Sequence, residues 1–239
     1  MPNIFLFIDL DDTLFQTKRK NPNGVIPATQ SAQAGKGSYM TTAQHLFWEL
    51  FYHSEKVKII PTTARDLQQY HNTWLSTAPR IDTAILYFAG MIFDQNTEEK
   101  QWQQHIKQAY QQLNWPISQL FTQVKKIVGN HPQFHLYNVD NYYITLKANA
   151  NCPLTTRESV FSQLKSLQNP EYFIHQNDRA FSFVPHFIDK KYAVQYLIET
   201  YQPELTLGVG DSLTDWSFMQ QCNFRIWPQN VQIEELMSL

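Results

Sequence analysis

The chain has 239 residues, of which 43% are hydrophobic and 14% aromatic, and its formal net charge is −2. This composition excludes a chain that is disordered throughout, and the charge gives no overall attraction to nucleic acid or to an anionic membrane. Because Cys152 and Cys222 are far apart, the apolar N-terminus is interrupted at Asp9, and no run is long enough to span a bilayer, we expect free thiols and a cytoplasmic protein with no membrane partner.

The first predicted element is a strand that ends in a cluster of acids. Residues 4–8 read Ile-Phe-Leu-Phe-Ile, which suits a strand covered on both faces, and Asp9, Asp11 and Asp12 follow it. In extended geometry Asp9 and Asp11 start on the same side, where they repel unless a cation or a shared proton lies between them. The pattern favours a hard cation such as Mg²⁺, although the acids taken alone suit an Asp-rich turn and helix cap equally well.

A polar segment and a helix separate this strand from the next. Residues 16–37 contain Lys18-Arg19-Lys20 and several small residues, so we expect a long loop with solvated basic side chains. The alternatives are a specialised lid, or a contact of the basic residues to a phosphate group or a nucleic-acid end. The following helix is expected to bury one apolar face. That face contains Ala43, Leu46, Phe47, Leu50 and Phe51.

A second apolar strand, over residues 57–62, ends in hydroxyls and an arginine. Thr62 and Thr63 both offer a hydroxyl at the strand end. Arg65 suits either a bound phosphate or an exposed ion pair.

Residues 90–184 differ in character and predict an α+β insertion. A strand-like run over 83–94 precedes it, and Gln-rich helical sequence follows. Strands are predicted over 140–147, 172–175 and 180–184, and Thr155-Thr156-Arg157-Glu158 has the pattern of a capping box before a helix.

The last polar positions combine lysines with a second pair of acids. Lys190 and Lys191 open a helix, and a strand over 205–210 is followed by Asp211 and Asp215. If Ser212 begins a helix, these two acids cannot be assumed to face one ion. A short strand is expected over 224–227. Strands that alternate with helices predict an α/β, doubly wound, mostly parallel sheet with these polar residues at its carboxyl edge.

The acid pair, the hydroxyl, the lysine and the second acid pair resemble, in that order, the four motifs of the haloacid dehalogenase (HAD) superfamily of phosphohydrolases. The resemblance is to type IIB members, including Cof-like and sucrose-phosphate-phosphatase-like enzymes. It implies a Rossmannoid catalytic core from residues 1–89 and 185–239 and an inserted C2-type cap from residues 90–184. Departures from the family pattern are Asp12 in place of glycine, Ala89-Gly90 in place of Asn-Gly, and Ser212 and Thr214 in the last motif.

The resemblance also implies a role for each motif residue. Asp9 would be the nucleophile, and Asp11 would be the general acid and then the base, a residue that superfamily dehalogenases lack. Thr63 would bind a phosphoryl oxygen, and Lys190, which fits the family spacing better than Lys191, would anchor the nucleophile. Mg²⁺ would be held by Asp9, the backbone carbonyl of Asp11, Asp211 and, directly or through water, Asp215. Arg65 and Ser212 are the candidate substrate-binding residues.

These assignments predict a Mg²⁺-dependent phosphomonoester hydrolase that acts on a small phosphorylated metabolite, with a sugar phosphate favoured, through an aspartyl-phosphate. A phosphomutase of the same superfamily is the alternative, as is a regulatory or binding protein with little turnover. The slightly acidic charge disfavours nucleic acid as a partner. The sequence carries no signal for an oligomeric state.

Overall fold

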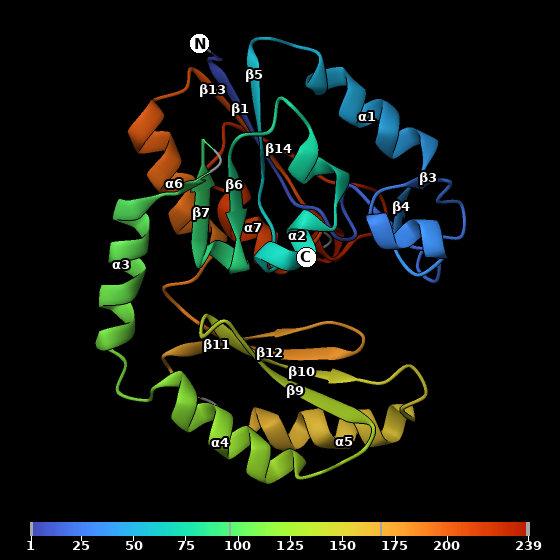
Figure 1. Ribbon diagram of the computed structural model, residues 1–239, viewed down its shortest axis with the longest axis vertical. Coiled ribbons are helices and arrows are strands. Elements are labelled where there is room, and N and C mark those ends of the chain that lie inside the picture. Colours follow the sequence, from blue (N-terminus) through green and yellow to red (C-terminus); the bar gives the residue numbers. More distant parts are fainter. Residues whose placement is uncertain (1, 96, 168, 238–239) are drawn as a thin grey trace. The chain divides into compact units, whose positions relative to one another are not determined.

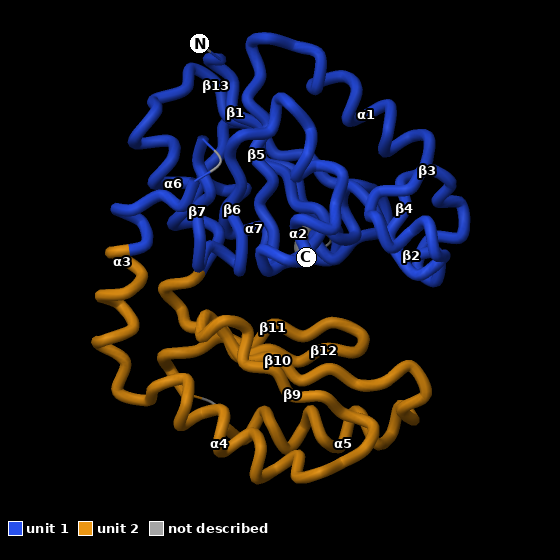
Figure 2. The backbone as a smooth tube through the Cα atoms, viewed as in Figure 1, with its two compact units in different colours: residues 1–103, 189–239 blue, residues 104–188 orange. Residues whose placement is uncertain are grey.

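The computed structural model describes residues 2–95, 97–167 and 169–237 (Figure 1). The chain divides into two compact units (Figure 2). Unit 1 comprises Met1–Gln103 and Asp189–Leu239, and unit 2 comprises Gln104–Ile188. Among the described residues, no helix is both long and apolar enough to cross a membrane.

Unit 1 is built on a four-stranded parallel sheet in the order β14-β13-β1-β5. The strands are β1 (Ile4–Ile8), β5 (Val57–Pro61), β13 (Leu205–Val209) and β14 (Phe224–Ile226). Phe5 to Ile8 are buried without alternation, as expected for a strand covered on both faces. The predicted doubly wound, mostly parallel sheet is therefore confirmed.

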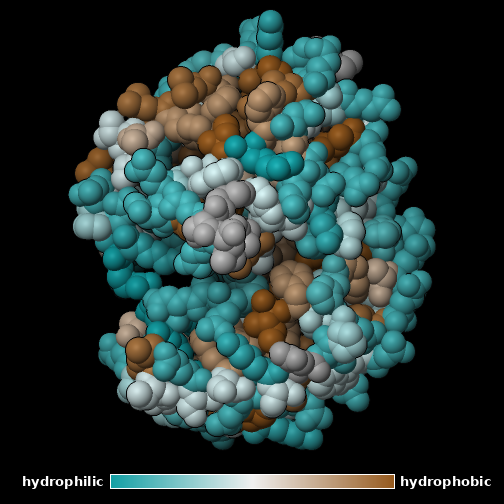
Figure 3. Space-filling model, turned by 180° about the vertical axis from the view of Figure 1, so that it is seen from behind, coloured by the Kyte–Doolittle hydropathy of each residue, from teal (hydrophilic) through white to brown (hydrophobic). Residues whose placement is uncertain are grey.

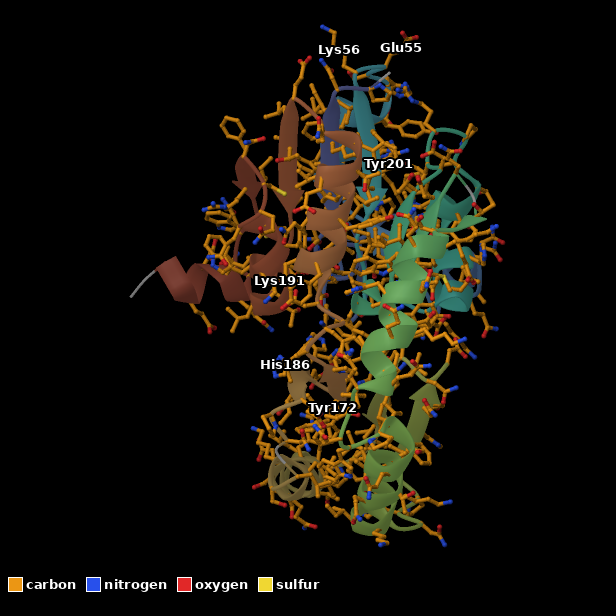
Figure 4. All side chains as sticks on the ribbon, turned by 90° about the vertical axis from the view of Figure 1, so that its left-hand side faces the viewer. Glu55, Lys56, Tyr172, His186, Lys191 and Tyr201 are labelled. Atoms are coloured by element: carbon orange, nitrogen blue, oxygen red, sulfur yellow. The ribbon has the colours of Figure 1, made fainter. Side chains whose placement is uncertain are left out.

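Three helices of unit 1 frame this sheet. Figure 1 shows α1 (Thr42–Tyr52) and α6 (Lys190–Tyr201) on opposite sides of it. The third, α7 (Leu213–Met219), packs against α6 and β13. Figure 4 labels Lys191 and Tyr201 near opposite ends of α6. Unit 1 also contains the short helices α2 (Leu67–His71), η2 (Trp74–Thr77) and α8 (Gln232–Met237).

The predicted buried face of α1 is wrong. Trp48 is the buried residue of this helix, whereas Leu46 is 59% and Leu50 73% exposed. The physical reason is aromatic packing: the Trp48 ring meets Trp74 edge to face at 4.8 Å and stacks on Tyr52 at 5.1 Å. Figure 3 shows hydrophobic residues gathered on the rear face of unit 1.

The segment predicted as a long loop contains a small sheet. Its strands are β2 (Gln16–Thr17), β3 (Ile26–Pro27) and β4 (Ser38–Met40), in the order β2-β4-β3, with η1 (Gln30–Ala34) between β3 and β4. Close packing makes this segment ordered: a Cβ at Gly37 would lie 2.1 Å from Thr29 Oγ1. Of its basic residues, Lys18 lies over the Tyr39 ring and Lys20 pairs with Asp12.

The run over residues 83–94, expected as one strand, is an antiparallel pair. It consists of β6 (Ala84–Leu86) and β7 (Met91–Asp94), joined by the single turn η3 (Tyr87–Ala89), and β7 also pairs with β8 (Thr97–Glu98). Residues 87 to 89 all have positive φ, which reverses the chain where the sequence reads as a continuous apolar strand.

Unit 2 has a four-stranded antiparallel sheet in the order β11-β12-β10-β9. Its strands are β9 (Phe134–Val139), β10 (Tyr143–Ala148), β11 (Tyr172–Gln176) and β12 (Ala180–Pro185). Helices α4 (Ile117–Val128) and α5 (Leu154–Lys165) contribute to one apolar core with the sheet, and α3 (Lys100–Gln111) enters the unit from unit 1.

The predicted capping box of α5 is wrong, because the helix begins earlier. Its N-cap is Pro153, which has no side chain to accept a hydrogen bond, and Arg157 N–H donates to Pro153 O at 3.0 Å. Thr155 therefore lies inside the first turn rather than at the cap. The paired strands β11 and β12 on either side of Asn177-Asp178 are confirmed.

Candidate active site

The sequence motifs converge at the carboxyl edge of the unit 1 sheet. Main-chain hydrogen bonds continue the sheet by one residue at this edge: Asp9 N–H donates to Val209 O, and Thr62 N–H donates to Ile8 O, both at 2.8 Å. The residues that follow β1, β5 and β13 are therefore brought to one place, as expected for parallel strands.

Lys190 joins two of the acids. It is the first residue of α6, its side chain is 4% exposed, and its Nζ lies 2.7 Å from Asp9 Oδ1 and 2.6 Å from Asp215 Oδ1. Lys191, the other candidate, turns to Asp189 at 3.5 Å. Of the two neighbouring lysines, it is Lys190 that contacts the buried acids.

Asp211 and Asp215 lie on the same side of the site, although a helix begins between them. Ser212 is the N-cap of α7, so Asp211 precedes the helix and Asp215 lies in its first turn. Asp215 Oδ2 accepts hydrogen bonds from Ser212 N–H and Ser212 Oγ, which completes a capping box. A Cβ at position 210 would lie 2.4 Å from Asp215 Cβ, so this turn requires Gly210. One ligand atom from each of Asp9, Asp211 and Asp215 lies within 4.8 Å of the others.

This group carries more negative than positive charge. Three buried carboxylates face one buried ammonium, and the pKa of Asp9 is raised well above its usual value, by burial first and then by Asp215, with Lys190 opposing. Burial and Asp215 together raise the pKa of Asp211 to about 7. Because oxygen ligands and an unbalanced negative charge are what a hard divalent cation prefers, this donor set fits Mg²⁺.

Thr13 is a site residue that the sequence reasoning missed. Its Oγ1 donates to Asp211 Oδ1 at 2.8 Å and its side chain is buried, so it orients a carboxylate of the cluster. The signal was present in the sequence as a threonine two residues after the Asp9-Leu10-Asp11 pattern. Asp12, which replaces the usual glycine, adopts φ 68°, a conformation that aspartate tolerates better than most residues.

Asp11 stands apart from this cluster. Its two carboxylate oxygens accept from Arg65 Nε and Nη2, both at 2.7 Å, in a two-pronged ion pair. Arg65 Nη1 also donates to Gln69 O, and the guanidinium lies over the Phe15 ring. β1 ends at Ile8, so strand alternation does not extend to Asp11, and Asp9 and Asp11 take different partners.

The remaining candidates are hydroxyls with identified contacts. Thr63 is 1% exposed and its Oγ1 accepts from Arg65 N–H, whereas Thr62 Oγ1 donates to the carbonyl of Ile60 in β5. Ser212 donates to Asp215 and caps α7. The structure thus brings Asp9, Lys190, Asp211 and Asp215 into direct contact or proximity. It joins Asp11 to the Arg65 side chain, and the Arg65 main chain to Thr63.

Comparisons with known proteins identify a family. The model of the sucrose-6F-phosphate phosphohydrolase family matches residues 2–238. A search of curated protein sequences finds no match.

Solved structures share the fold at low sequence identity. The sucrose-phosphatase of Synechocystis sp., solved with sucrose and phosphate, is 16% identical, covers 100% of this chain and 87% of its own, and gives a TM-score of 0.60. A Thermoplasma acidophilum protein is 12% identical over 99% of this chain and 89% of its own, with a TM-score of 0.60. The C-terminal domain of Candida albicans trehalose-6-phosphate phosphatase is 15% identical, covers 92% of this chain and 73% of its own, and gives a TM-score of 0.56.

Four motifs at one sheet edge and a family match over nearly the whole chain lead to the same conclusion: the chain is a phosphatase of the HAD superfamily and belongs to the sucrose-6F-phosphate phosphohydrolase family.

Proposed function

We propose that this chain hydrolyses the phosphomonoester of a small sugar through a phosphoryl intermediate on Asp9. The observation that carries the proposal is the contact of buried Lys190 with Asp9 beside Asp211 and Asp215. A lysine that binds one oxygen of a carboxylate holds it in place and favours its ionised form, which is the form that attacks phosphorus.

In the proposed reaction, Asp9 Oδ2 attacks phosphorus, since Oδ1 is bound by Lys190. Asp11, which leaves Arg65 and takes a proton from solvent as the substrate binds, gives this proton to the sugar oxygen as the bond between phosphorus and that oxygen breaks. Water then attacks the phosphorus of the aspartyl-phosphate, Asp11 takes the proton from this water, and Asp9 is released with inorganic phosphate. The Thr63 hydroxyl donates to a phosphoryl oxygen.

The proposed cofactor is Mg²⁺, held by the carboxylates of Asp9 and Asp211, by Asp215 directly or through water, and by the main-chain carbonyl of Asp11. When bound, it would neutralise negative charge between the phosphate and the carboxylates. Ser212, which caps α7 and donates to Asp215, would act by holding that carboxylate. Arg65 and Ser212 are also proposed to contact the substrate.

We further propose that residues 90–184 serve as a C2-type cap. Unit 2 supports this, because its antiparallel sheet with two helices is inserted in the chain between the second and third motifs. The family description makes sucrose 6F-phosphate the first substrate to test, and trehalose 6-phosphate is the matched second disaccharide phosphate.

The test is release of inorganic phosphate from these two compounds, glucose 6-phosphate and an aryl phosphate, with Mg²⁺ and with chelator. Asp9→Asn is the inactive variant, and Asp189→Asn, at the α6 cap, is a control with the same charge change. Release that needs Mg²⁺ and is lost only in Asp9→Asn supports hydrolysis. Isomerised sugar phosphate without release identifies a mutase, and neither product from a folded chain favours a regulatory or binding role.

A further inference from the structure

The turn between β6 and β7 is held in an unfavourable backbone conformation. Tyr87, Phe88 and Ala89 have φ of 54°, 60° and 105°, and all three are at most 3% exposed. Residues with a Cβ rarely adopt such angles, and three in succession persist only where the surroundings hold them. The residues that hydrogen-bond to this turn therefore indicate its structural role.

On one side the turn holds the loop that follows β5. Tyr87 N–H donates to Arg65 O at 2.9 Å, and Phe88 N–H donates to Thr63 O at 3.1 Å. Thr63 N–H in turn donates to Ile85 O at 2.9 Å. These three main-chain bonds fix both residues, and Arg65 passes the constraint to Asp11 through its two-pronged ion pair.

On the other side the turn is held by the start of α3. Trp102 is 4% exposed, and its Nε1 donates to Ala89 O at 2.8 Å. Gln103 Nε2 donates to Gly90 O at 3.3 Å. The boundary between the units falls immediately after these residues, between Gln103 and Gln104, inside α3 (Figure 2). α3 is thus one of the two places where the chain passes between the units.

We propose that Trp102 is a positioning residue. It links the start of α3, where the chain passes from unit 1 to unit 2, to the loop that carries Thr63 and Arg65. The indole N–H fixes the left-handed turn, the turn fixes the two motif residues, and Arg65 holds Asp11 until Asp11 leaves it to act as the acid. The roles of Thr63 and Asp11 in this inference rest on the proposed function. The hydrogen-bonded path itself lies wholly within unit 1 and needs no substrate.

The indole nitrogen, rather than the ring alone, carries the effect. Phenylalanine at position 102 would retain most of the buried apolar contact but leave the carbonyl of Ala89 without its donor, and a buried acceptor without a partner is unfavourable. We expect the turn to relax from its strained angles and the Tyr87 and Phe88 bonds to lengthen. Thr63 and Arg65 would then be less well placed for the transition state.

The experiment compares Trp102→Phe with Trp115→Phe, the same substitution in unit 2. It measures amide hydrogen exchange at Thr63, Tyr87 and Phe88, together with kcat and KM for the best substrate of the phosphate-release panel. We expect Trp102→Phe to speed exchange at these amides about tenfold and to lower kcat about tenfold, the effect of ~1.4 kcal/mol, with KM within about twofold. Trp115→Phe should change neither quantity.

Unchanged exchange at these amides, or an equal fall of kcat in Trp115→Phe, overturns the proposal. If Trp102→Phe does not fold, Gln103→Ala removes the weaker bond, and about a threefold change in the same amides is expected; no change there is equally contradictory. A wild-type chain without phosphatase activity would refute the proposed function, while the exchange result would still decide the path from Trp102 to Thr63.

Discussion

Unit 1 buries charge, whereas unit 2 buries a nearly pure apolar core. Within the described residues, the buried charged side chains are Asp9, Lys190, Asp211 and Asp215, and all belong to unit 1. The buried polar side chains of unit 2 are Thr145 and Ser182, whose hydroxyls bond each other at 2.9 Å. Its core consists of residues such as Phe134, Phe161 and Phe181.

This difference between the two cores distinguishes residues that stabilise the fold from residues that serve the reaction. Removing three carboxylates and an ammonium from water is unfavourable, and replacing such groups by apolar ones often stabilises a protein. A buried, unbalanced cluster is therefore better explained by a bound cation and a reacting phosphate than by stability. Unit 2, with no comparable cluster among its described residues, gains its stability from apolar burial.

The largest expected effect comes from removing the single positive charge of the cluster. Lys190→Met leaves Asp9 and Asp215 buried without their ammonium, so we expect a loss of about 3–5 kcal/mol in the free energy of unfolding and loss of phosphatase activity. Urea denaturation and phosphate release measure the two effects.

Lys191→Met is the matched control, since its ammonium pairs with Asp189 near the surface. We expect its unfolding free energy to change by less than ~1 kcal/mol. Equal losses in the two variants would show that the buried contact of Lys190 is not what stabilises the site.

A similar loss of stability, without loss of the metal site, is expected in unit 2. Phe181 is 1% exposed and contacts the rings of Phe161 and Phe183 at 5.3 Å, so Phe181→Ala should cost about 3–5 kcal/mol. The rise in melting temperature that Mg²⁺ causes should be the same as in wild type. If the variant lost this rise, the metal site in unit 1 would depend on the apolar core of unit 2, contrary to the expectation.

The smallest expected effect is the dependence of stability on pH without metal. Burial first, and then Asp215, raises the pKa of Asp211 to about 7, and the pKa of Asp9 is also raised. The folded chain then binds protons more tightly than the unfolded chain, so stability in chelator should fall as pH rises from about 4 to about 7. Urea titrations across this range measure the slope.

Mg²⁺ should oppose this fall, because a cation favours the ionised carboxylates, and at 100 times its Kd it adds about 2.7 kcal/mol. Asp211→Asn is the control: it should lose the part of the pH dependence that comes from Asp211, while the part from Asp9 remains, and it should lose most of the stabilisation by Mg²⁺. Two results would argue against a cation-binding cluster. One is a metal-free protein whose free energy of unfolding rises over the same pH range, and the other is a free energy of unfolding that does not change when Mg²⁺ is added.

The sequence predicted the sheet and the cluster because both depend on residues at strand ends. Parallel strands bring their carboxyl ends together, so Asp9, Thr63 and Asp211 could be placed without knowing any packing. The partner of Asp11 could not be predicted, since Arg65 lies 54 positions away and the choice between phosphate and ion pair depends on side-chain conformation. The strained turn over residues 87–89 was hidden in an apolar run that reads as a strand.

The errors in the helices have different causes. Apolar residues occupy most positions of α1, so its periodicity does not select one face, and the choice is made by Trp74, a residue beyond the next strand. The cap of α5 was misplaced because the helix begins at Pro153, before the threonine motif that suggested its start. Helix α4 was not predicted, although Ile117, Leu120, Val124 and Val128 have helical spacing.

The most direct test of the account is to trap the phosphoryl group on Asp9 during turnover. The enzyme is quenched with acid while it hydrolyses its best substrate in Mg²⁺, treated with borohydride, which reduces an acyl phosphate to the alcohol, and digested for mass spectrometry. We expect position 9 to be converted to homoserine, and only when substrate is present. An active enzyme in which Asp9 stays unmodified, or in which another residue is reduced instead, would contradict it.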